Sequence, residues 1–354
     1  MNRLTYLTSE LSMARRARFI LCFLLLICAT TILRAYEFEA GGIVYNILSD
    51  TEAEVALGDY SGDITISSTV TDNGKTYSVI SIGDDAFYNC SGLTSIEIPE
   101  SVTHIGSGAF SWCSGLTSIV IPNSVTYIGE GAFAWCESLT AIALPASLTS
   151  IGSYAFYNCR KLTSIAIPKG VTGIDYAVFY NCSSLTSIAL PEGLTGISGF
   201  AFNGCTALTS MAIPDCVTSI GEWAFYGCSG LTSMTIPNSV ASIGELAFSG
   251  CWNLTSIISL IEEPFAITDG FTNWSGVDIY SSATLYCPNP EAYSMTNGWK
   301  EFKNIKGLDE LPTAIRQVES NREGRGVVYD LNGHRVEHPT KGLYVVNGKK
   351  VMMK

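Results

Sequence analysis

Phenylalanine and cysteine each recur at a fixed step of 23 residues along this chain. The phenylalanine series runs from Phe87 to Phe248 and the cysteine series from Cys90 to Cys251, with eight members in each and no slippage. A constant period of this length indicates one short supersecondary unit that stacks on copies of itself, because a single unit cannot bury its own apolar face. The chain is therefore predicted to be a solenoid, and a buried catalytic cleft is not expected.

The repeated unit reads L-T-S-I-x-I-P-x-S-V-T-x-I-G-x-x-A-F-x-x-C, and its first part has the pattern of a strand. In the copy that begins at Leu93, alternation places Ile96 and Ile98 inside and Ser95 and Glu97 outside. The proline that follows ends the strand, because it lacks the donor that ladder pairing needs. Strands are predicted to begin at Leu93, Leu116, Leu139, Leu162, Leu185, Leu208, Leu231 and Leu254.

The second part of each unit is predicted to return the chain to the next strand. Val102 and Ile105 are expected to point inward, and residues 109–113 are expected to close the coil through a short helical turn. Glycine is expected where the chain turns sharply, because it adopts backbone conformations that other residues avoid. It recurs at Gly106, Gly129, Gly152, Gly221 and Gly244. The predicted fold is an α/β solenoid, a right-handed coil of 23-residue units with short parallel strands and short helical turns.

The eight cysteines of the series, called the ladder cysteines below, are predicted to be buried free thiols. On successive coils their side chains would project in parallel about 4.8 Å apart, the spacing between strands. Parallel side chains do not readily supply the near-perpendicular torsion of a disulfide, so alternating disulfide pairs are the less favoured alternative. Zinc is not indicated, because the chain has no C-x-x-C motif and the series has no accompanying histidines.

The N-terminus has the pattern of an export signal. Arg15, Arg16 and Arg18 precede the apolar run 19–32, and Ala35 supplies a small residue before a possible cleavage point. This run is shorter than the roughly 20 residues that span a bilayer, so a cleaved signal peptide over residues 1–35 is favoured over an uncleaved anchor.

Three segments follow the signal peptide before the tail. Residues 36–75 have strand-like alternation and are predicted to form an N-terminal cap, because an end coil would otherwise expose its core. Residues 76–258 hold the leucine-rich repeats. Residues 259–312 lose the period and gain prolines, and they are predicted to form the C-terminal cap.

The tail, residues 313–354, is predicted to be a polar linker followed by a small β-hairpin region. Apolar stretches at 327–331 and 343–346 are followed by Asn332-Gly333 and by Asn347-Gly348. Asn-Gly next to an apolar run is a strong signal for a hairpin turn.

Charge restricts the classes of partner. The chain has a formal net charge of −12, which becomes more negative once the arginine-containing residues 1–35 are removed. A strongly acidic protein repels nucleic acids and anionic membranes, so neither is an expected partner.

Catalytic chemistry is not indicated. The three histidines, His104, His334 and His338, have no convergent partners in the sequence, and His104 occupies a variable repeat position that favours a surface role. Cys216 and Cys287 depart from the series, but neither has a nearby histidine that would activate it. No nucleotide-binding, hydrolase or metalloprotease motif occurs, and the acidic stretches at 59–63 and 84–85 lack calcium-loop spacing. The chain is predicted to be non-enzymatic, with no cofactor and no metal.

Two surfaces of the predicted solenoid are candidates for binding a partner. The outward strand positions form a small, nearly uncharged face: Ser95, Glu97, Ser118, Val120, Ala141, Ala143, Ser164, Ala166, Ser187, Ala189, Ser210, Ala212, Ser233, Thr235, Ser256 and Ile258. The turn segments carry aromatics outside the invariant core positions: Tyr88, Trp112, Trp135, Tyr157, Tyr180 and Tyr226, with Tyr154, Tyr176 and Trp223 close by. These aromatics are candidate binding residues, although packing between adjacent turns is the favoured interpretation.

The repeated unit resembles the BspA-like subclass of leucine-rich repeats over about residues 36–310, including the capping sequences Y-E-F-E-A-G-G-I-V-Y-N-I-L and T-L-Y-C-P…G-W-K-E-F. This resemblance implies an exported or cell-surface protein of anaerobic bacteria that acts in adhesion, including binding to host matrix proteins. The tail, with Y-D-L-N-G-H-R-V and K-G-L-Y-V-V-N-G-K-K-V-M-M-K, resembles the C-terminal sorting domains of type IX secretion. It implies outer-membrane passage, removal of the tail, and attachment to or release from the surface.

Three hypotheses about function follow. A surface adhesin that binds a host or bacterial protein would tolerate loss of Trp112 and Trp135 but depend on the strand face. A carbohydrate-binding or scaffold protein would show the reverse dependence. A structural surface-layer component would have no discrete ligand.

Overall fold

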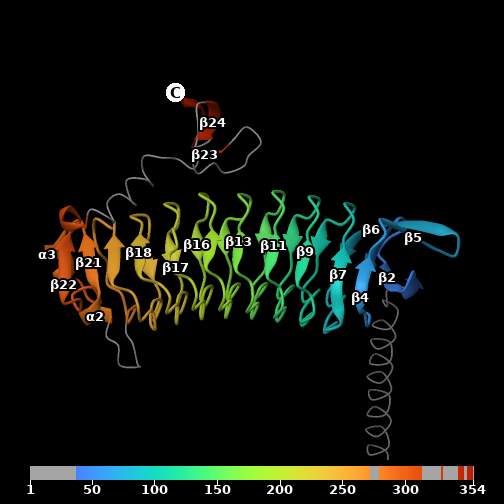
Figure 1. Cartoon of the computed structure of the whole chain (residues 1–354), viewed down its shortest axis with the longest axis horizontal. Coiled ribbons are helices and arrows are strands. Elements are labelled where there is room, and N and C mark those ends of the chain that lie inside the picture. The colour runs from blue at the N-terminus through green and yellow to red at the C-terminus, as the bar shows by residue number, and fades with distance from the viewer. Residues whose placement is uncertain (1–36, 272–278, 313–327, 330–341, 347–348, 354) are drawn as a thin grey trace, which may run out of the picture.

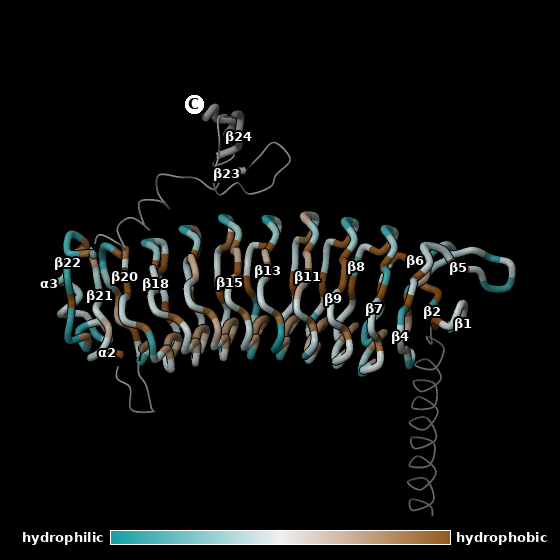
Figure 2. The backbone as a smooth tube through the Cα atoms, in the orientation of Figure 1, coloured by the Kyte–Doolittle hydropathy of each residue, from teal (hydrophilic) through white to brown (hydrophobic). Residues whose placement is uncertain are grey.

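The computed structural model describes residues 37–271 and 279–312, together with the backbone of residues 328–329, 342–346 and 349–353. The predicted signal peptide, residues 1–35, lies outside the described residues. The described chain forms an elongated solenoid whose coils stand side by side in a row, from the N-terminal cap to the C-terminal cap (Figure 1). Hydrophobic residues recur at matching places in successive coils (Figure 2). The predicted solenoid is therefore confirmed.

One column of parallel strands, called the outer ladder below, follows the predicted L-T-S-I pattern. Most neighbouring strands pair in a register of 23 residues, so that Ala141 pairs with Ser118 and Ser187 with Ser164. At the N-terminal end, the strand at 93–97 pairs with the strand at 62–65 at a separation of 31–32 residues, and it belongs to a different sheet from the strand at 118–120. The strands of the outer ladder are β4 (Gly62–Thr65), β7 (Leu93–Glu97), β9 (Ser118–Val120), β11 (Ala141–Ala143), β13 (Ser164–Ala166), β15 (Ser187–Ala189), β18 (Ser233–Ile236) and β20 (Ser256–Ser259). The coil between β15 and β18 contributes only a bridge between Ala212 and Thr235.

A second column of parallel strands, the return ladder, was not predicted as a sheet. Two residues of each return leg pair with the same residues of the next coil, as when Tyr127 and Ile128 pair with Ser150 and Ile151. Its strands are β6 (Lys75–Ile82), β8 (His104–Ile105), β10 (Tyr127–Ile128), β12 (Ser150–Ile151), β14 (Gly173–Ile174), β16 (Gly196–Ile197), β17 (Ser219–Ile220) and β19 (Ser242–Ile243). Pairing is interrupted between β12 and β14.

The segment that closes each coil is not the short helical turn predicted from the sequence. Phe110 N and Trp112 N donate to Ala132 O and Ala134 O of the next coil, whereas Ser111 N donates back to its own coil. A helix would retain all of these donors within one segment. Residues 108 and 112 also have left-handed φ angles of 61° and 65°, which interrupt any helix. The solenoid is thus mainly β, with little helix.

The helices of the described chain lie in the C-terminal cap and are short. They are α2 (Ile279–Ser282), α3 (Pro290–Met295) and the 3-10 turn η1 (Leu308–Glu310). Within the described ranges, no helix combines the length and the apolar character needed to cross a membrane.

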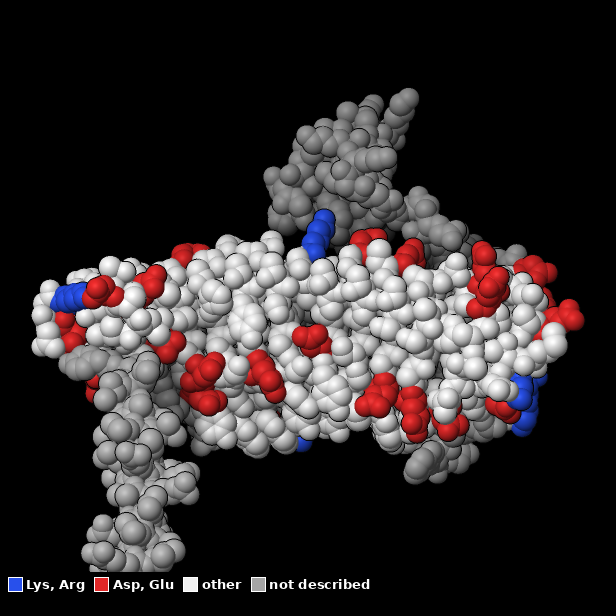
Figure 3. Space-filling view, turned by 180° about the vertical axis from the view of Figure 1, so that it is seen from behind, with Lys and Arg blue, Asp and Glu red and all other residues white. Residues whose placement is uncertain are grey.

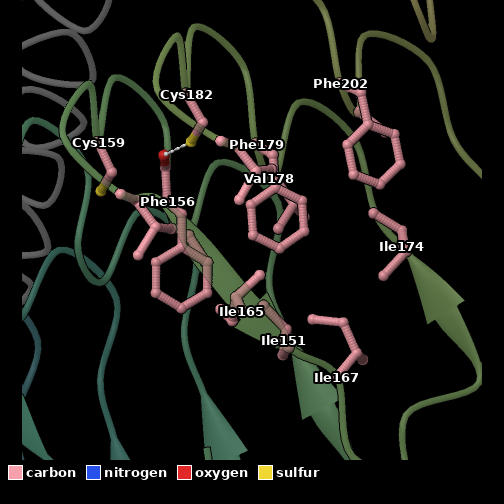
Figure 4. Packing of buried hydrophobic residues seen from close by; sticks show 14 of the residues in the cluster. Ile151, Phe156, Cys159, Ile165, Ile167, Ile174, Val178, Phe179, Cys182 and Phe202 are labelled. Atoms are coloured by element: carbon pink, nitrogen blue, oxygen red, sulfur yellow. Dashed lines mark hydrogen bonds between the residues drawn. The ribbon is translucent and has the colours of Figure 1, made fainter. Parts of the chain in front are cut away.

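A continuous stack of phenylalanine rings forms the centre of the core. Neighbouring rings from Phe87 to Phe271 lie 5.0–5.5 Å apart between centroids, with interplanar angles of 2–10°. Figure 4 shows this arrangement for Phe156, Phe179 and Phe202. Phe271 continues the 23-residue step beyond Phe248, so the period of the stack extends into the predicted C-terminal cap.

The ladder cysteines are buried free thiols, so that prediction is confirmed. Each thiol from Cys113 to Cys251 donates to the carbonyl oxygen of a phenylalanine 26 residues earlier, at 3.1–3.2 Å. Cys182, for example, donates to Phe156 O (Figure 4). These bonds give the thiol a second role beside packing, because each one links two coils.

Cys216 is expected to react with thiol reagents much faster than the ladder cysteines. Cys216 is exposed, whereas the ladder cysteines and Cys287 are buried. Burial also raises the pKa of the Cys113, Cys251 and Cys287 thiols to about 12, which suppresses the reactive thiolate. With Ellman's reagent at pH 8, we expect Cys216→Ser to remove one rapidly reacting equivalent from the native protein. Rapid reaction of the ladder thiols without denaturant would contradict the buried arrangement.

Both ends of the phenylalanine stack are closed by aromatic rings in a different orientation. Tyr60 covers Phe87 at 4.7 Å with a tilt of 46°. At the other end, Phe302 meets Phe271 edge-on at 5.2 Å and Trp299 lies 5.8 Å away. The caps are β-rich, with β1 (Glu37–Ala40), β2 (Ile43–Ile47), β3 (Glu52–Val55) and β5 (Thr69–Asp72) at one end and β21 (Thr284–Cys287) and β22 (Asn304–Gly307) at the other.

The recurrent glycines are required by close packing between coils. Gly106, Gly129 and Gly152 do not have positive φ angles, so they are not needed for the backbone freedom that the sequence analysis expected of them. A Cβ atom at Gly129 would lie 2.5 Å from Ser107 N, and one at Gly152 would lie 2.6 Å from Glu130 N. The glycine therefore allows the return legs of adjacent coils to approach each other.

The tail contributes a small antiparallel sheet of β23 (Val328–Tyr329), β24 (Gly342–Val346) and β25 (Lys349–Met353). Strands β24 and β25 flank Asn347-Gly348, as the predicted hairpin requires. The partner expected for 327–331 across Asn332-Gly333 lies outside the described residues, and β23 pairs instead with β24.

Candidate binding surfaces

The outward residues of the outer ladder form the predicted strand face over most of its length. From Ser95 to Ala212 these small side chains are exposed, and Val120 is 75% exposed. At the C-terminal end the prediction is wrong for Ser256 and Ile258, which are buried. They belong to β20, which lies between β18 and the cap strand β21 and is buried at every position. The strand face therefore ends before the C-terminal cap.

Nine aromatic side chains on the turn segments form one connected cluster, called the aromatic edge below. Each ring contacts at least one other ring of the set, within its own coil or in an adjacent coil, so that together the contacts connect six successive coils. The members are Trp112, Trp135, Tyr154, Tyr157, Tyr176, Tyr180, Phe200, Trp223 and Tyr226.

The first part of the aromatic edge is a column of alternating stacked and tilted rings. Trp112 and Trp135 stack at 4.4 Å with an interplanar angle of 8°, and Tyr157 and Tyr180 stack at 4.7 Å and 10°. Between these pairs, Trp135 and Tyr157 are tilted by 53° at 5.9 Å.

The second part of the aromatic edge continues toward the C-terminus. Tyr176 contacts Phe200 at 5.3 Å, Phe200 stacks on Trp223 at 5.7 Å and 3°, and Trp223 contacts Tyr226 at 4.7 Å. Tyr154 contacts both Tyr157 and Tyr176 and so joins the two parts.

Five of the six candidate binding residues predicted from the sequence belong to this cluster. They are Trp112, Trp135, Tyr157, Tyr180 and Tyr226. Tyr88 is 48% exposed but lies one coil before Trp112 and makes no ring contact with another described residue. Packing between turns and solvent exposure coexist here, because Trp112 is 41% and Tyr226 37% exposed.

Sequence reasoning missed Phe200 and the cation that accompanies the rings. Phe200 lies two residues before a stack phenylalanine, as do Tyr154 and Trp223, so the 23-residue alignment contains the signal. The missed cation is Arg160, whose guanidinium lies 5.7 Å from the centroid of Trp135.

Several of these aromatics occupy backbone conformations that normally favour glycine or asparagine. Trp112, Trp135, Tyr154, Phe200 and Trp223 have φ angles of 57–65°. In other coils the same positions hold glycine or asparagine, as at Gly108, Gly131, Asn158, Asn181, Gly204 and Gly227. A bulky residue in the left-handed region costs about 1–2 kcal/mol. The left-handed conformation is a property of these two positions in each coil, because Asp85, Ala177 and Leu246 share it without belonging to the aromatic edge.

Acidic residues share the turn segments with the aromatic edge. Glu130, Asp175, Glu222 and Glu245 lie on the same turn segments, and all four are exposed. Burial raises the pKa of the Tyr176 phenol, and Tyr154 and the Glu222 carboxylate raise it further. On the face turned away from the viewer of Figure 1, acidic side chains are much more frequent than basic ones (Figure 3).

The remaining candidate groups have local partners. His104 is exposed and lies 2.7 Å from the Thr103 hydroxyl. Asp63 accepts hydrogen bonds from Ser95 and Thr94, which lower the pKa of its carboxyl. Within the part of the chain that the structure describes, no three His, Cys, Asp or Glu side chains converge as metal ligands.

Comparison with known proteins yields one family match. The profile of the BspA type leucine rich repeat region, in six copies, matches residues 68–186 and 149–262, which together exceed half of the chain. No curated protein matches the chain.

Three solved structures are similar to this chain. A leucine-rich cell surface protein of Faecalibacterium prausnitzii is 25% identical, covering 80% of this chain and 97% of its own, with a TM-score of 0.48. A leucine-rich repeat protein of Bacteroides ovatus is 26% identical, covering 81% and 97%, with a TM-score of 0.48. The leucine-rich repeat protein of T. pallidum is 27% identical, covering 62% and 91%, with a TM-score of 0.49.

Proposed function

Because the chain belongs to the BspA-type leucine-rich repeat family, we propose that it is an exported, non-enzymatic surface protein. We propose further that it binds a protein partner through its aromatic edge. The partner is a host matrix protein or a protein of a neighbouring bacterium. Adhesion follows from such binding when the protein is held at the cell surface.

The observation that carries this proposal is the continuous cluster of partly exposed rings on the turn segments. Tryptophan and tyrosine dominate the residues on which protein–protein affinity depends. From the coil of Trp112 to that of Tyr226 there are five coil steps, or about 24 Å at the usual strand spacing. That distance is the length of about seven residues of extended peptide. The strand face, on which the adhesin hypothesis from the sequence relied, offers small side chains and few anchors, so the proposal reverses that dependence and assigns protein binding to the aromatic edge.

A binding panel with matched variants tests the proposal. The full-length chain is applied to immobilised mucosal and matrix proteins, and binding is measured by biolayer interferometry. For a partner found in this way, we expect the double variant Trp112→Asn, Trp135→Asn to weaken binding at least tenfold, because two tryptophan anchors are lost. Asparagine already occupies this position at Asn89, Asn158 and Asn181, so the fold should be retained.

The matched control is Trp252→Ala, which removes a tryptophan that is 49% exposed and lies outside the aromatic edge. We expect it to change affinity less than twofold. Equal losses in the control and the double variant, or binding that depends only on strand-face residues such as Val120, would contradict the proposal.

Carbohydrate binding is the second candidate, and one observation favours it. Trp112 ends its column, and the preceding coil has Asn89 rather than a ring at the same position, so one indole face has no aromatic neighbour. Sugar rings stack on open faces of this kind. A glycan array on which signal disappears with Trp112→Asn, together with an empty protein panel, would favour this candidate.

Export and surface attachment complete the proposal. Residues 1–35 are proposed as a signal peptide, and the tail, residues 313–354, as a sorting segment that is removed at the surface. The apolar run after three arginines and the two Asn-Gly hairpin motifs support these assignments. Mass spectrometry of the protein released from native cells tests both, with new termini expected near residues 36 and 312.

A further inference from the structure

We infer that the aromatic edge recognises a cationic, arginine- or lysine-containing segment of its partner in an extended conformation. This inference rests on the proposed function and specifies the chemistry of the partner. It follows from one contact within the protein, from a second place where a ring and a carboxylate lie together, and from the distribution of charge.

Arg160 shows within the chain how a cation fits this surface. Its guanidinium lies 5.7 Å from the centroid of Trp135, and its Nε atom lies 3.7 Å from a carboxylate oxygen of Glu137. Trp135 stacks on Trp112 on one side, and Tyr157 meets it at a tilt of 53°. The negative face of the ring attracts the cation, and the carboxylate provides its counter-charge.

Other parts of the aromatic edge have the ring and the carboxylate but no cation. Tyr176 and Glu222 lie on either side of Gly199, where an added Cβ atom would be 3.3 Å from the Tyr176 ring and 3.2 Å from the Glu222 side chain. The ring of Phe200 lies 5.3 Å from that of Tyr176, and the two planes are tilted by 48°. An incoming arginine or lysine would find there the same two groups that hold Arg160.

The charge of the repeats favours a cationic occupant over other partners. Residues 76–258 contain eleven acidic residues but only three basic ones, which are Arg160, Lys161 and Lys169. Arg160 is already engaged by Glu137 and Trp135. An acidic peptide or a second copy of this acidic chain would be repelled, whereas a cationic segment would be attracted.

Labelled peptides provide a direct test. The probe is a nine-residue Gly-Ser peptide with four arginines, and its control has citrulline at the same four positions. Citrulline keeps the size and shape of arginine but has no charge. By fluorescence anisotropy with the full-length chain in 50 mM salt, we expect the arginine peptide to bind at least tenfold more tightly. Raising the salt to 300 mM should reduce this difference, because exposed charges are then screened.

Two sets of variants locate the binding site. Trp223→Gly and the double variant Glu130→Gln, Glu222→Gln should each weaken binding of the arginine peptide three- to tenfold. Glycine already occupies the position of Trp223 at Gly108 and Gly131, so that fold should be retained. The matched charge control is Glu100→Gln, Glu192→Gln, which removes two exposed carboxylates that follow the proline of the unit, outside the turn segments. The control should change affinity less than twofold, and circular dichroism confirms that each variant is folded.

The outcomes separate this inference from the proposed function. Equal affinity for the arginine and citrulline peptides, or equal losses in the edge variants and the charge control, would overturn the inference. A protein partner that binds through the aromatic edge while the arginine peptide does not bind would overturn the inference alone. Binding of the arginine peptide together with an empty protein panel would support the inference and contradict the proposed function.

Discussion

Replacing Phe133 by alanine is expected to lower the free energy of unfolding by about 3–5 kcal/mol. The Phe133 side chain is fully buried and stacks between Phe110 at 5.2 Å and Phe156 at 5.5 Å. Truncation therefore removes two ring contacts and leaves a cavity within a stack that no other side chain can fill. Because coils of a solenoid contact only their neighbours, the loss should also loosen this region locally.

Urea denaturation followed by circular dichroism measures this effect. Trp252→Ala is the control, since its side chain is exposed and lies outside the stack, and it should change stability by about 0.5 kcal/mol or less. Hydrogen exchange should show the greatest loss of protection in the coils on either side of residue 133. A loss of less than about 1 kcal/mol in Phe133→Ala would show that the ring does not belong to the core.

Alkaline pH is expected to unfold the solenoid over a narrow range. Burial raises the pKa of every ladder thiol above its ordinary value of 9.0, to about 12 for Cys113 and Cys251. In the unfolded chain the thiols ionise near pH 9, whereas in the folded chain they remain protonated. Stability is thus fully present below about pH 9 and is lost as the pH rises toward 12.

The size of this effect comes from the number of thiols that act together. Each thiol whose pKa stays raised removes about 1.4 kcal/mol of stability for each pH unit in this window, and the losses add for thiols that unfold together. Urea midpoints measured between pH 8 and pH 11 should therefore fall steeply. The double variant Cys159→Ala, Cys182→Ala, which removes two of the eight thiols, should reduce the slope by about a quarter. A stability that does not change up to pH 11 would contradict the burial of the ladder.

The core of this fold could be predicted because each coil repeats the same apolar positions. The step from Phe87 to Phe248 fixes which residues stack, and the period-two pattern around Ile96 identifies the inner side of the outer ladder. The return ladder was not anticipated, because only two residues per coil pair there, too few to give an alternating pattern. The prediction of a helical turn at the end of each coil was wrong. The A-F-x-x-C segment has helical composition, but its backbone N–H groups donate alternately to carbonyls of its own coil and of the next coil.

The candidate site was only partly predictable for a similar reason. Variable aromatics such as Trp112 and Tyr157 are visible in the alignment of repeats, and their position on the turn segment follows from the period. Their connection into one cluster depends on the left-handed φ angles at two positions of each coil, where glycine and asparagine alternate with bulky rings. Arg160 was missed because its partner Trp135 lies in the preceding coil.

Because only the two ends of the phenylalanine stack are closed by differently oriented rings, the number of coils between them can change without altering either end. Interior interfaces are nearly interchangeable, as the Phe133–Phe156 and Phe202–Phe225 contacts of 5.5 Å and 5.3 Å illustrate. Different rings terminate the series, with Tyr60 at one end and Phe302 and Trp299 at the other. Duplication or deletion of one 23-residue unit in frame would preserve every junction. Unequal recombination between the tandem copies in the gene would then lengthen or shorten the molecule by about 4.8 Å at a time. The length of the solenoid could therefore change during evolution while the contacts between coils stay the same.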